Sequence, residues 1–285
     1  MAQTTLISTD VLAKHIKDAS YAVIDCRFKL DDPAWGEREY AAAHIPGAVY
    51  AHLDRDLSSH QTGTNGRHPL PDPIEFSIKM GTFGLESGTQ VVVYDQNNGM
   101  FASRMWWLLR WVGHSAVAVL DGGFEKWMKE GRATRSGVER RRRTEFKGTR
   151  QSNMMVDATT VTQLTERSDW RLVDARAPER YRGEVEPLDK KAGHIPTAVN
   201  HPFTTNMAAD GTFKTPEELR AHFAPTLGTV PPDQIVCYCG SGVTACHNLL
   251  AMEHAGLKGA KLYPGSWSEW SSDDTRPVAV GPSST

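Results

Sequence analysis

The 285-residue chain contains only four cysteines, and three of them, Cys237, Cys239 and Cys246, crowd one short segment. So few cysteines in such positions do not form the disulfide framework of a secreted domain. The chain also lacks a run of about 18 or more apolar residues, which a membrane span requires. Its N-terminus has no basic segment followed by an apolar run, as a secretory signal has. These absences predict a cytoplasmic protein that has no membrane partner.

An excess of one charge is missing as well, because 32 Lys and Arg residues stand against 34 Asp and Glu residues. A chain with this balance has no overall field that would attract a nucleic acid. One local exception is the run of four arginines at 140–143. A nucleic-acid patch and a solvated connector both fit such a run, and the balanced chain favours a connector over residues 139–153.

Four segments recur in the same order in the two halves of the chain. The pairs, first copy before second, are 23–27 and 172–176, 43–49 and 193–199, 91–95 and 234–239, and 122–127 and 265–270. A repeat this long is a duplicated domain and not a solenoid unit, and the length of the chain also favours two domains. We therefore expect one domain over residues 1–138 and a second over residues 154–285.

Each half alternates short apolar segments with amphipathic ones. This alternation predicts an α/β fold in which each domain is a parallel sheet with helices on both faces. The expected helices are 9–17, 100–112 and 124–130 in the first half, and 158–167, 244–255 and 267–271 in the second. The aromatic segment 106–111 is expected in the core or at a domain interface.

Two pairs of polar residues occupy equivalent places in both copies. Asp25 and Asp174 end predicted strands, and we expect them to hold their domains together through hydrogen bonds and ion pairs. His44 and His194 precede Ile-Pro in both copies. A reaction that occurs in only one copy therefore does not explain these histidines.

The two copies differ at the end of one strand, where the first has Asp95 and the second has Cys239. A loop containing Gly240 and Gly242 follows this cysteine, and a helix is predicted to begin near Thr244. Glycines allow successive N–H groups to point inward and form an anion-binding nest at a helix N-terminus. Such a setting favours a thiolate, so Cys239 is the expected nucleophile of the chain.

Three other functions of a cysteine in such a loop are open to test. A tyrosine-type phosphatase needs an Arg at the end of the loop to bind phosphate oxygens, and residues 243–245 are Val-Thr-Ala. A thioredoxin-like dithiol needs Cys-x-x-Cys, which the Cys237 and Cys239 spacing does not give. A zinc site could use Cys237, Cys239, Cys246 and His247, although their spacing fits no common ligand pattern.

A neutral loop of N–H donors suits a cysteine that accepts one sulfur atom as a persulfide and passes it on. The charge of a persulfide lies on the outer sulfur, where the nest and the helix dipole stabilise it. The expected binding residues of the loop are Gly240, Gly242, Val243 and Thr244. This chemistry requires no metal and no organic cofactor.

The chain resembles the tandem-domain rhodanese family over nearly its whole length. The resemblance lies in the repeated Asp-x-Arg and His-Ile-Pro motifs, the Asp in place of Cys in the first copy, and Cys-Gly-Ser-Gly-Val-Thr-Ala at 239–245. It implies a sulfurtransferase that moves sulfur from 3-mercaptopyruvate or thiosulfate through a Cys239 persulfide. The implied acceptor is cyanide, a thiol or a thioredoxin-like protein. A persulfide carrier without small-molecule turnover is the alternative.

The sequence of the cysteine loop resembles the mercaptopyruvate branch, because thiosulfate enzymes of the animal type carry cationic residues there. The resemblance implies a relay of Ser241, His68 and Asp56. A relay makes chemical sense, since the pyruvate enolate left after sulfur removal must be protonated. The alternatives are that His68 is an ordinary loop histidine and that Asp56 caps a turn.

Arg180 matches the family position that binds the carboxylate of the donor, for which a guanidinium is a suitable bidentate partner. A second Arg is expected shortly afterwards, but this chain has Asp189 at that place. Lys190 or Lys191 could substitute after a shift of the loop. Alternatively, the enzyme prefers thiosulfate or another sulfur donor.

Overall fold

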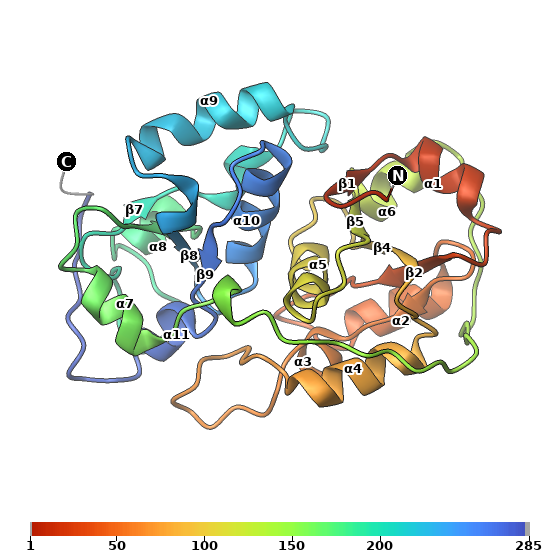
Figure 1. The fold of residues 1–285 in the computed structure, drawn as a ribbon, viewed down its shortest axis with the longest axis horizontal. Coiled ribbons are helices and arrows are strands. Elements are labelled where there is room, and N and C mark those ends of the chain that lie inside the picture. Colours follow the sequence, from red (N-terminus) through yellow and green to blue (C-terminus); the bar gives the residue numbers. More distant parts are fainter. Residues whose placement is uncertain (1, 283–285) are drawn as a thin grey trace. The chain divides into compact units, whose positions relative to one another are not determined.

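The computed structural model describes residues 2–282, which form two compact units (Figure 1). The first unit contains residues 2–59, 70–151 and 209–213, and the second contains residues 60–69, 152–208 and 214–282. The division thus departs from the halves of the sequence at two short segments. The segment 60–69 comes from the first half of the chain and belongs to the second unit.

The first unit contains a five-stranded parallel sheet with the strand order β1-β5-β4-β2-β3. The strands are β1 (Leu6–Ile7), β2 (Tyr21–Asp25), β3 (Val49–Tyr50), β4 (Gln90–Tyr94) and β5 (Val117–Leu120). The helices are α1 (Thr9–His15), α2 (Trp35–Ala42), α3 (Leu53–Asp56), α4 (Pro73–Thr82), α5 (Ala102–Trp111) and α6 (Gly123–Lys129).

The second unit contains a four-stranded parallel sheet with the order β7-β6-β8-β9. The strands are β6 (Arg171–Asp174), β7 (Val199–Asn200), β8 (Ile235–Tyr238) and β9 (Lys261–Leu262). The helices are α7 (Ala158–Leu164), α8 (Pro178–Tyr181), α9 (Pro216–Leu227), α10 (Thr244–His254) and α11 (Ser266–Trp270), with 3₁₀ turns η1 (Ser152–Met154), η2 (Phe203–Asn206) and η3 (Pro232–Gln234).

The α/β fold predicted from the sequence is confirmed, and all six expected helices are present. Four of them are shorter than predicted, and α6 and α11 are shifted by one residue toward the N-terminus. The α7 helix ends at Leu164 and not at 167, and α5 begins at Ala102 and not at 100, after the chain turns at Gly99 with a φ of 79°. Three longer helices, α2, α4 and α9, were not expected. Among residues 2–282, none of the helices combines the length and the apolar character that crossing a membrane requires.

The equivalent polar residues have the structural role that their repetition indicates. Arg27 Nη2 lies 2.6 Å from Asp25 Oδ2, and Arg176 Nη2 lies 2.7 Å from Asp174 Oδ2. In both units the histidine before Ile-Pro places Nδ1 2.8 Å from a tyrosine carbonyl oxygen and stacks on that tyrosine ring. Arg27 also donates to the Ala43 carbonyl at 2.6 Å, and Arg176 to the Gly193 carbonyl at 2.7 Å, which ties the segment before each histidine to the carboxyl end of β2 or β6.

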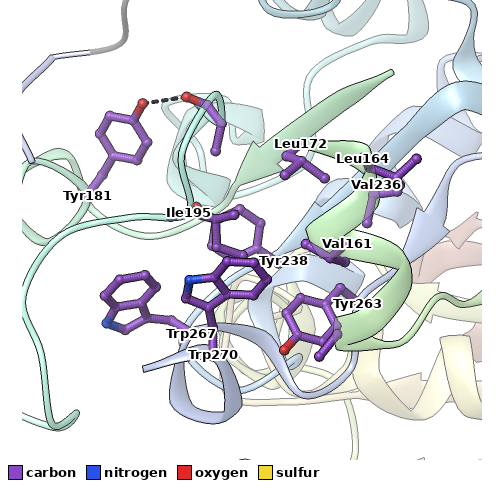
Figure 2. Close-up of a cluster of buried hydrophobic side chains, with 12 residues drawn as sticks. Val161, Leu164, Leu172, Tyr181, Ile195, Val236, Tyr238, Tyr263, Trp267 and Trp270 are labelled. Atoms are coloured by element: carbon purple, nitrogen blue, oxygen red, sulfur yellow. Dashed lines mark hydrogen bonds between the residues drawn. The ribbon is translucent and has the colours of Figure 1, made fainter. Parts of the chain in front are cut away.

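The core of the second unit is rich in aromatic side chains (Figure 2). Trp267 and Trp270 of α11 are completely buried, and each donates its indole N–H to a backbone carbonyl at 2.8 Å, Trp267 to Lys191 and Trp270 to Pro277. Burying such large rings contributes strongly to stability, and the polar end requires a partner when it is buried. Through Trp267, this core fixes the backbone near Asp189.

Residues 139–151, part of the expected connector, run along the first unit. The N–H of Thr144 donates to the Gly81 carbonyl at 3.0 Å, and the N–H of Thr149 donates to the Val112 carbonyl at 2.9 Å. Phe146 between them is buried. The chain here is therefore held by backbone hydrogen bonds and by one apolar anchor.

Candidate active site

Cys239 follows β8 directly, in the turn that leads into α10. Its side chain is buried, and the N–H of Gly242 donates to its Sγ at 3.1 Å. Gly242 has a φ of 77°, and a Cβ at this position would lie 2.4 Å from the Pro264 carbonyl oxygen. Only glycine fits this backbone. The turn that directs an N–H at the sulfur therefore depends on Gly242.

The loop is anchored to the start of α11 by backbone hydrogen bonds. The N–H groups of Trp267 and Ser268 donate to the carbonyls of Cys239 and Gly240, both at 2.9 Å. The N–H of Cys239 donates to Ser266 Oγ at 3.1 Å. These bonds fix the position of the thiol before any substrate binds, which is the preorganisation that an active-site loop needs.

The neighbouring thiols are in different surroundings. Burial raises the pKa of Cys237, which lies within β8. Cys246 is also buried and donates its S–H to the Gly242 carbonyl at 3.2 Å, so it packs in the core as expected. None of the four cysteines, all of them in the described part of the chain, is in a disulfide. Cys239 is thus the candidate nucleophile.

The segment 60–69 brings His68 to the cysteine loop. His68 Nδ1 lies 2.7 Å from Ser241 Oγ, and both side chains are buried. The segment approaches α11 closely at Gly66, whose φ is 84° and where a Cβ would lie 2.8 Å from the Gly265 carbonyl oxygen. The structure therefore brings together two of the three residues of the expected relay.

Asp56 lies at the end of α3 in the first unit. Its carboxylate accepts the N–H of His52 at 2.8 Å and lies 2.6 Å from Lys79 Nζ. These contacts are those of a residue that caps a short helix and pairs with a neighbouring helix. The participation of Asp56 in a relay stays a prediction.

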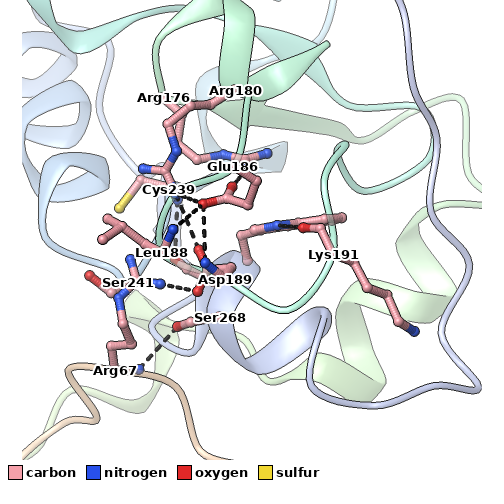
Figure 3. A network of polar contacts seen from close by, with 12 residues as sticks. Arg67, Arg176, Arg180, Glu186, Leu188, Asp189, Lys191, Cys239, Ser241 and Ser268 are labelled. Atoms are coloured by element: carbon pink, nitrogen blue, oxygen red, sulfur yellow. Dashed lines mark hydrogen bonds and ion pairs between the residues drawn. The ribbon is translucent and has the colours of Figure 1, made fainter. Parts of the chain in front are cut away.

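Arg180 lies in a network of acidic and basic side chains next to Cys239 (Figure 3). Arg180 Nη2 lies 2.6 Å from Glu186 Oε1 and 3.2 Å from Asp189 Oδ2. Glu186 Oε2 lies 3.2 Å from Arg176 Nη1. Arg180 Nε is buried and has no hydrogen-bond partner among residues 2–282. A buried donor without a partner is costly, and it is a place where a ligand oxygen would be stabilised.

A further cation of this network is Arg67, which sequence reasoning missed. Its Nη1 pairs with Asp189 Oδ1, and its backbone N–H donates to Ser268 Oγ at 3.0 Å. Lys190 and Lys191, the expected substitutes, instead lie 3.5 and 3.0 Å from the carboxylate of Asp274. The sequence contains one indication that Arg67 lies near the cysteine loop, which is that it directly precedes His68.

Both guanidinium groups lie against Gly240. A Cβ at this position would be 2.9 Å from Arg67 Nη2 and 3.5 Å from Arg180 Nη1. The absence of a side chain at Gly240 therefore lets two cations approach the residue that follows the thiol. The pKa of Arg67 is lowered by burial and by Arg180, and the charge of Cys239 partly opposes this effect.

The described geometry is that of a nucleophile with an anion site beside it. A thiol lies on a rigid loop, two guanidinium groups flank the next residue, and a serine–histidine pair occupies the same loop. Such an arrangement can bind an anionic sulfur compound, and its thiolate can attack the sulfur atom.

Comparison with known proteins shows the family to which the chain is related. The model of the rhodanese-like domain family matches residues 8–130 and again residues 157–273. A probable 3-mercaptopyruvate sulfurtransferase of Pseudomonas aeruginosa is 46% identical over 283 residues, which cover 99% of this chain and 100% of that protein. A thiosulfate sulfurtransferase of Cricetulus griseus is 35% identical over 276 residues, which cover 93% of this chain and 91% of that protein.

A solved structure has the same fold. The crystal structure of SseA from Escherichia coli, described as a 3-mercaptopyruvate sulfotransferase, matches with a TM-score of 0.82 and 34% identity, covering 94% of this chain and all of that one. The family match in both halves and the curated relatives agree with the duplicated motifs. The chain therefore belongs to the tandem-domain rhodanese family of sulfurtransferases.

Proposed function

We propose that this sulfurtransferase takes the sulfur atom of 3-mercaptopyruvate, holds it as the sulfane sulfur of a persulfide on Cys239, and passes it to a thiol or to cyanide. The observation that carries the proposal is the composition of the loop around the thiol. Gly242 donates its N–H to Cys239 Sγ, Ser241 contacts His68, and Gly240 faces the guanidinium groups of Arg67 and Arg180.

In the first half-reaction, the Cys239 thiolate attacks the sulfur atom of the donor. The S–S bond forms as the C–S bond breaks, and the electron pair of the C–S bond stays on carbon as pyruvate enolate. The proton of the donor thiol is transferred to that carbon, which gives pyruvate and Cys239-S-S⁻. The N–H groups of the loop stabilise the negative outer sulfur, and Gly240, Gly242, Val243 and Thr244 supply this environment.

The Ser241 and His68 pair would carry the proton in this step. The two side chains lie 2.7 Å apart, so a proton can pass between them. Asp56 completes the proposed relay. Thiosulfate leaves as sulfite and needs no proton transfer to carbon. The presence of the pair therefore favours mercaptopyruvate as the donor, with thiosulfate as the alternative.

In the second half-reaction, the acceptor attacks the outer sulfur. Cyanide forms thiocyanate, and a small thiol or a thioredoxin-like protein forms its own persulfide. The S–S bond breaks and Cys239 returns to the thiolate. Because the donor product leaves before the acceptor enters, the kinetics are expected to be ping-pong.

Two further expectations belong to the same proposal. The first is a cytoplasmic location, which the absence of a disulfide among the described cysteines supports. The second is that residues 154–285 form the catalytic domain and residues 1–138 a domain without a nucleophile, joined by residues 139–153. The Asp95 and Cys239 difference supports this assignment.

The decisive experiment measures kcat/KM for 3-mercaptopyruvate and for thiosulfate with cyanide as acceptor, together with the intact mass of the protein after each donor alone. We expect one added sulfur atom and a larger kcat/KM for mercaptopyruvate. A larger kcat/KM for thiosulfate would establish the alternative donor. Sulfur uptake without turnover of either donor would make the protein a carrier.

A further inference from the structure

The anion site beside Cys239 is occupied by a carboxylate of the protein itself. Asp189 presents Oδ1 to Arg67 Nη1 and Oδ2 to Arg180 Nη2, so each of its oxygens has one guanidinium partner (Figure 3). Its side chain is only 3% exposed. This is the arrangement in which a carboxylate ligand would be bound by two arginines.

The backbone around Asp189 is held independently of its side chain. The N–H groups of Leu188 and Asp189 donate to Glu186 Oε1 at 3.1 and 3.2 Å. The Lys191 carbonyl accepts the Trp267 indole N–H at 2.8 Å. The Asp189 carboxylate can therefore turn away from the arginines while the segment that carries it stays in place.

The charges of this network balance before a donor binds. The three guanidinium groups of Arg67, Arg176 and Arg180 are paired with the three carboxylates of Asp174, Glu186 and Asp189. An ionised Cys239 adds one negative charge. A donor with one charge meets less repulsion here than a donor with two, since like charges at short distance in a buried site repel strongly.

We propose that Arg67 is the second donor-binding guanidinium of this enzyme and that Asp189 is an internal competitor, which the carboxylate of the donor displaces. Asp189 thereby selects a monoanionic α-keto acid thiol over dianionic thiosulfate. The inference rests on the proposed function, and it adds the residues that set donor affinity and donor choice.

The first test removes the charge of Asp189 and keeps its shape. In Asp189→Asn we expect the kcat/KM for thiosulfate to rise about tenfold and that for mercaptopyruvate about threefold, mainly through KM, because the dianion gains more from the lost repulsion. Pyruvate, a carboxylate that carries no sulfur, should inhibit the variant more strongly than the original protein. The matched control is Asp274→Asn, which removes a carboxylate that is 73% exposed and outside this network.

The second test removes the guanidinium of Arg67 and keeps its apolar stem. In Arg67→Met we expect the KM of both donors to rise about 10- to 100-fold, as for the loss of a charge-assisted contact. Adding Asp189→Asn to Arg67→Met should change kinetics less than Asp189→Asn alone, because a double-mutant cycle detects residues that share one interaction. Arg67→Lys keeps the charge without the planar fork, so its donor KM should lie between that of the original protein and that of Arg67→Met.

Two outcomes would overturn the inference while the proposed function stands. The first is an Arg67→Met variant that takes up sulfur on Cys239 with unchanged KM for both donors. The second is an Asp189→Asn variant with an unchanged donor ratio and unchanged inhibition by pyruvate. A failure of the proposed function would be recognised separately, because the original protein would then add no sulfur to Cys239 from either donor.

Discussion

The loop after β4 in the first unit and the loop after β8 in the second hold different groups in equivalent places. The Asp95 carboxylate accepts four backbone N–H groups, from Asn97 at 3.2 Å, Gly99 at 3.0 Å, Phe101 at 2.8 Å and Ala102 at 3.1 Å. Cys239 Sγ accepts the N–H of Gly242. One loop surrounds a carboxylate of the protein with N–H donors, and the other presents a thiol at the corresponding end of the second sheet.

The comparison shows how a duplicated loop separates structure from chemistry. Six residues lie between Asp95 and the start of α5 at Ala102, whereas four lie between Cys239 and the start of α10 at Thr244. The longer loop surrounds its carboxylate with donors, and burial still raises the pKa of Asp95. The shorter loop is tied to α11 and leaves space at Gly240, where a substrate anion can approach.

The largest expected effect comes from removing the thiol. Cys239→Ser should lose about 10⁴-fold or more of the activity, as loss of a nucleophile does, and should gain no sulfur by intact-protein mass spectrometry. Cys246→Ala is the control for a buried thiol outside the loop and should still gain one sulfur atom. Sulfur uptake by Cys239→Ser would show that the loop after β8 does not hold the nucleophile that accepts sulfur.

The next effect concerns the loop after β4. Asp95→Ala leaves three buried N–H groups, those of Gly99, Phe101 and Ala102, without their acceptor, so we expect it to lower the free energy of unfolding by roughly 3 kcal/mol or more. Urea denaturation measures this change, and Asp31→Ala, at an exposed carboxylate, is the control. If Asp95→Ala were as stable as the control, the Asp95 carboxylate would not stabilise its loop, and the contrast between a structural loop and a reactive one would fail.

The two units should also differ in their response to acid. Where the first unit has Ala51, the second has His201. The N–H of Ala51 donates to the backbone carbonyl of Asp25 at the end of β2, and that of His201 to the carbonyl of Asp174 at the end of β6. Burial lowers the pKa of His201 to about 4 from its ordinary 6.5. Above pH 6.5 the histidine is neutral in both the folded and the unfolded chain. Below it the unfolded chain binds a proton that the folded chain does not.

Stability should therefore fall from about pH 6.5 to about pH 4, by roughly 3 kcal/mol in total for this residue. We expect His201→Gln to flatten the pH dependence of the free energy of unfolding, although it costs stability at neutral pH through the contact with Asn206. His60→Gln, at an exposed histidine of the same unit, should leave the dependence as it is. An unchanged slope in His201→Gln would place the acid sensitivity elsewhere.

The smallest expected effect concerns Gly240, the position in the loop after β8 where a substrate anion can approach. Gly240→Ala would put a Cβ 2.9 Å from Arg67 Nη2 and must displace this flexible side chain. We expect a rise in donor KM of about three- to tenfold with little change in kcat, which corresponds to the loss of binding shared by ground state and transition state. Gly88→Ala adds a Cβ that meets nothing within 4 Å and should have no effect.

Much of the fold could be predicted because the chain contains the same series of strand, loop and helix motifs twice. The matched Tyr94 and Tyr238 have the same role, since each hydroxyl accepts the N–H of the isoleucine after His, at 3.3 and 3.2 Å. The repeated motifs predicted the two parallel sheets, and the difference between the copies at Asp95 and Cys239 predicted the cysteine loop. The missed helices had local signals that the repeats did not emphasise. For α9 the signal is the capping box of Thr215 and Glu218, and for α4 it is Asp72 before Pro73.

Arg67 could not be predicted in the same way. Its place depends on contacts with residues such as Ser268, 201 positions away along the chain, and on a close approach at Gly66 that no periodicity reveals. The site of Asp189 was recognised only as a departure from an expected Arg. The structure adds that this carboxylate lies between two guanidinium groups, which is a property of the folded chain alone.

The placement of the segment 60–69 in the second unit has a consequence for synthesis on the ribosome. His68 meets Ser241 across 173 positions, and Arg67 meets Ser268 across 201 positions. Because domains fold in order from the N-terminus as they are made, this segment leaves the ribosome long before its partners exist. The histidine and the arginine thus reach the thiol only when almost the whole chain has been translated. A truncated product could carry Cys239, yet it would lack α11, which fixes the loop and the segment that completes it.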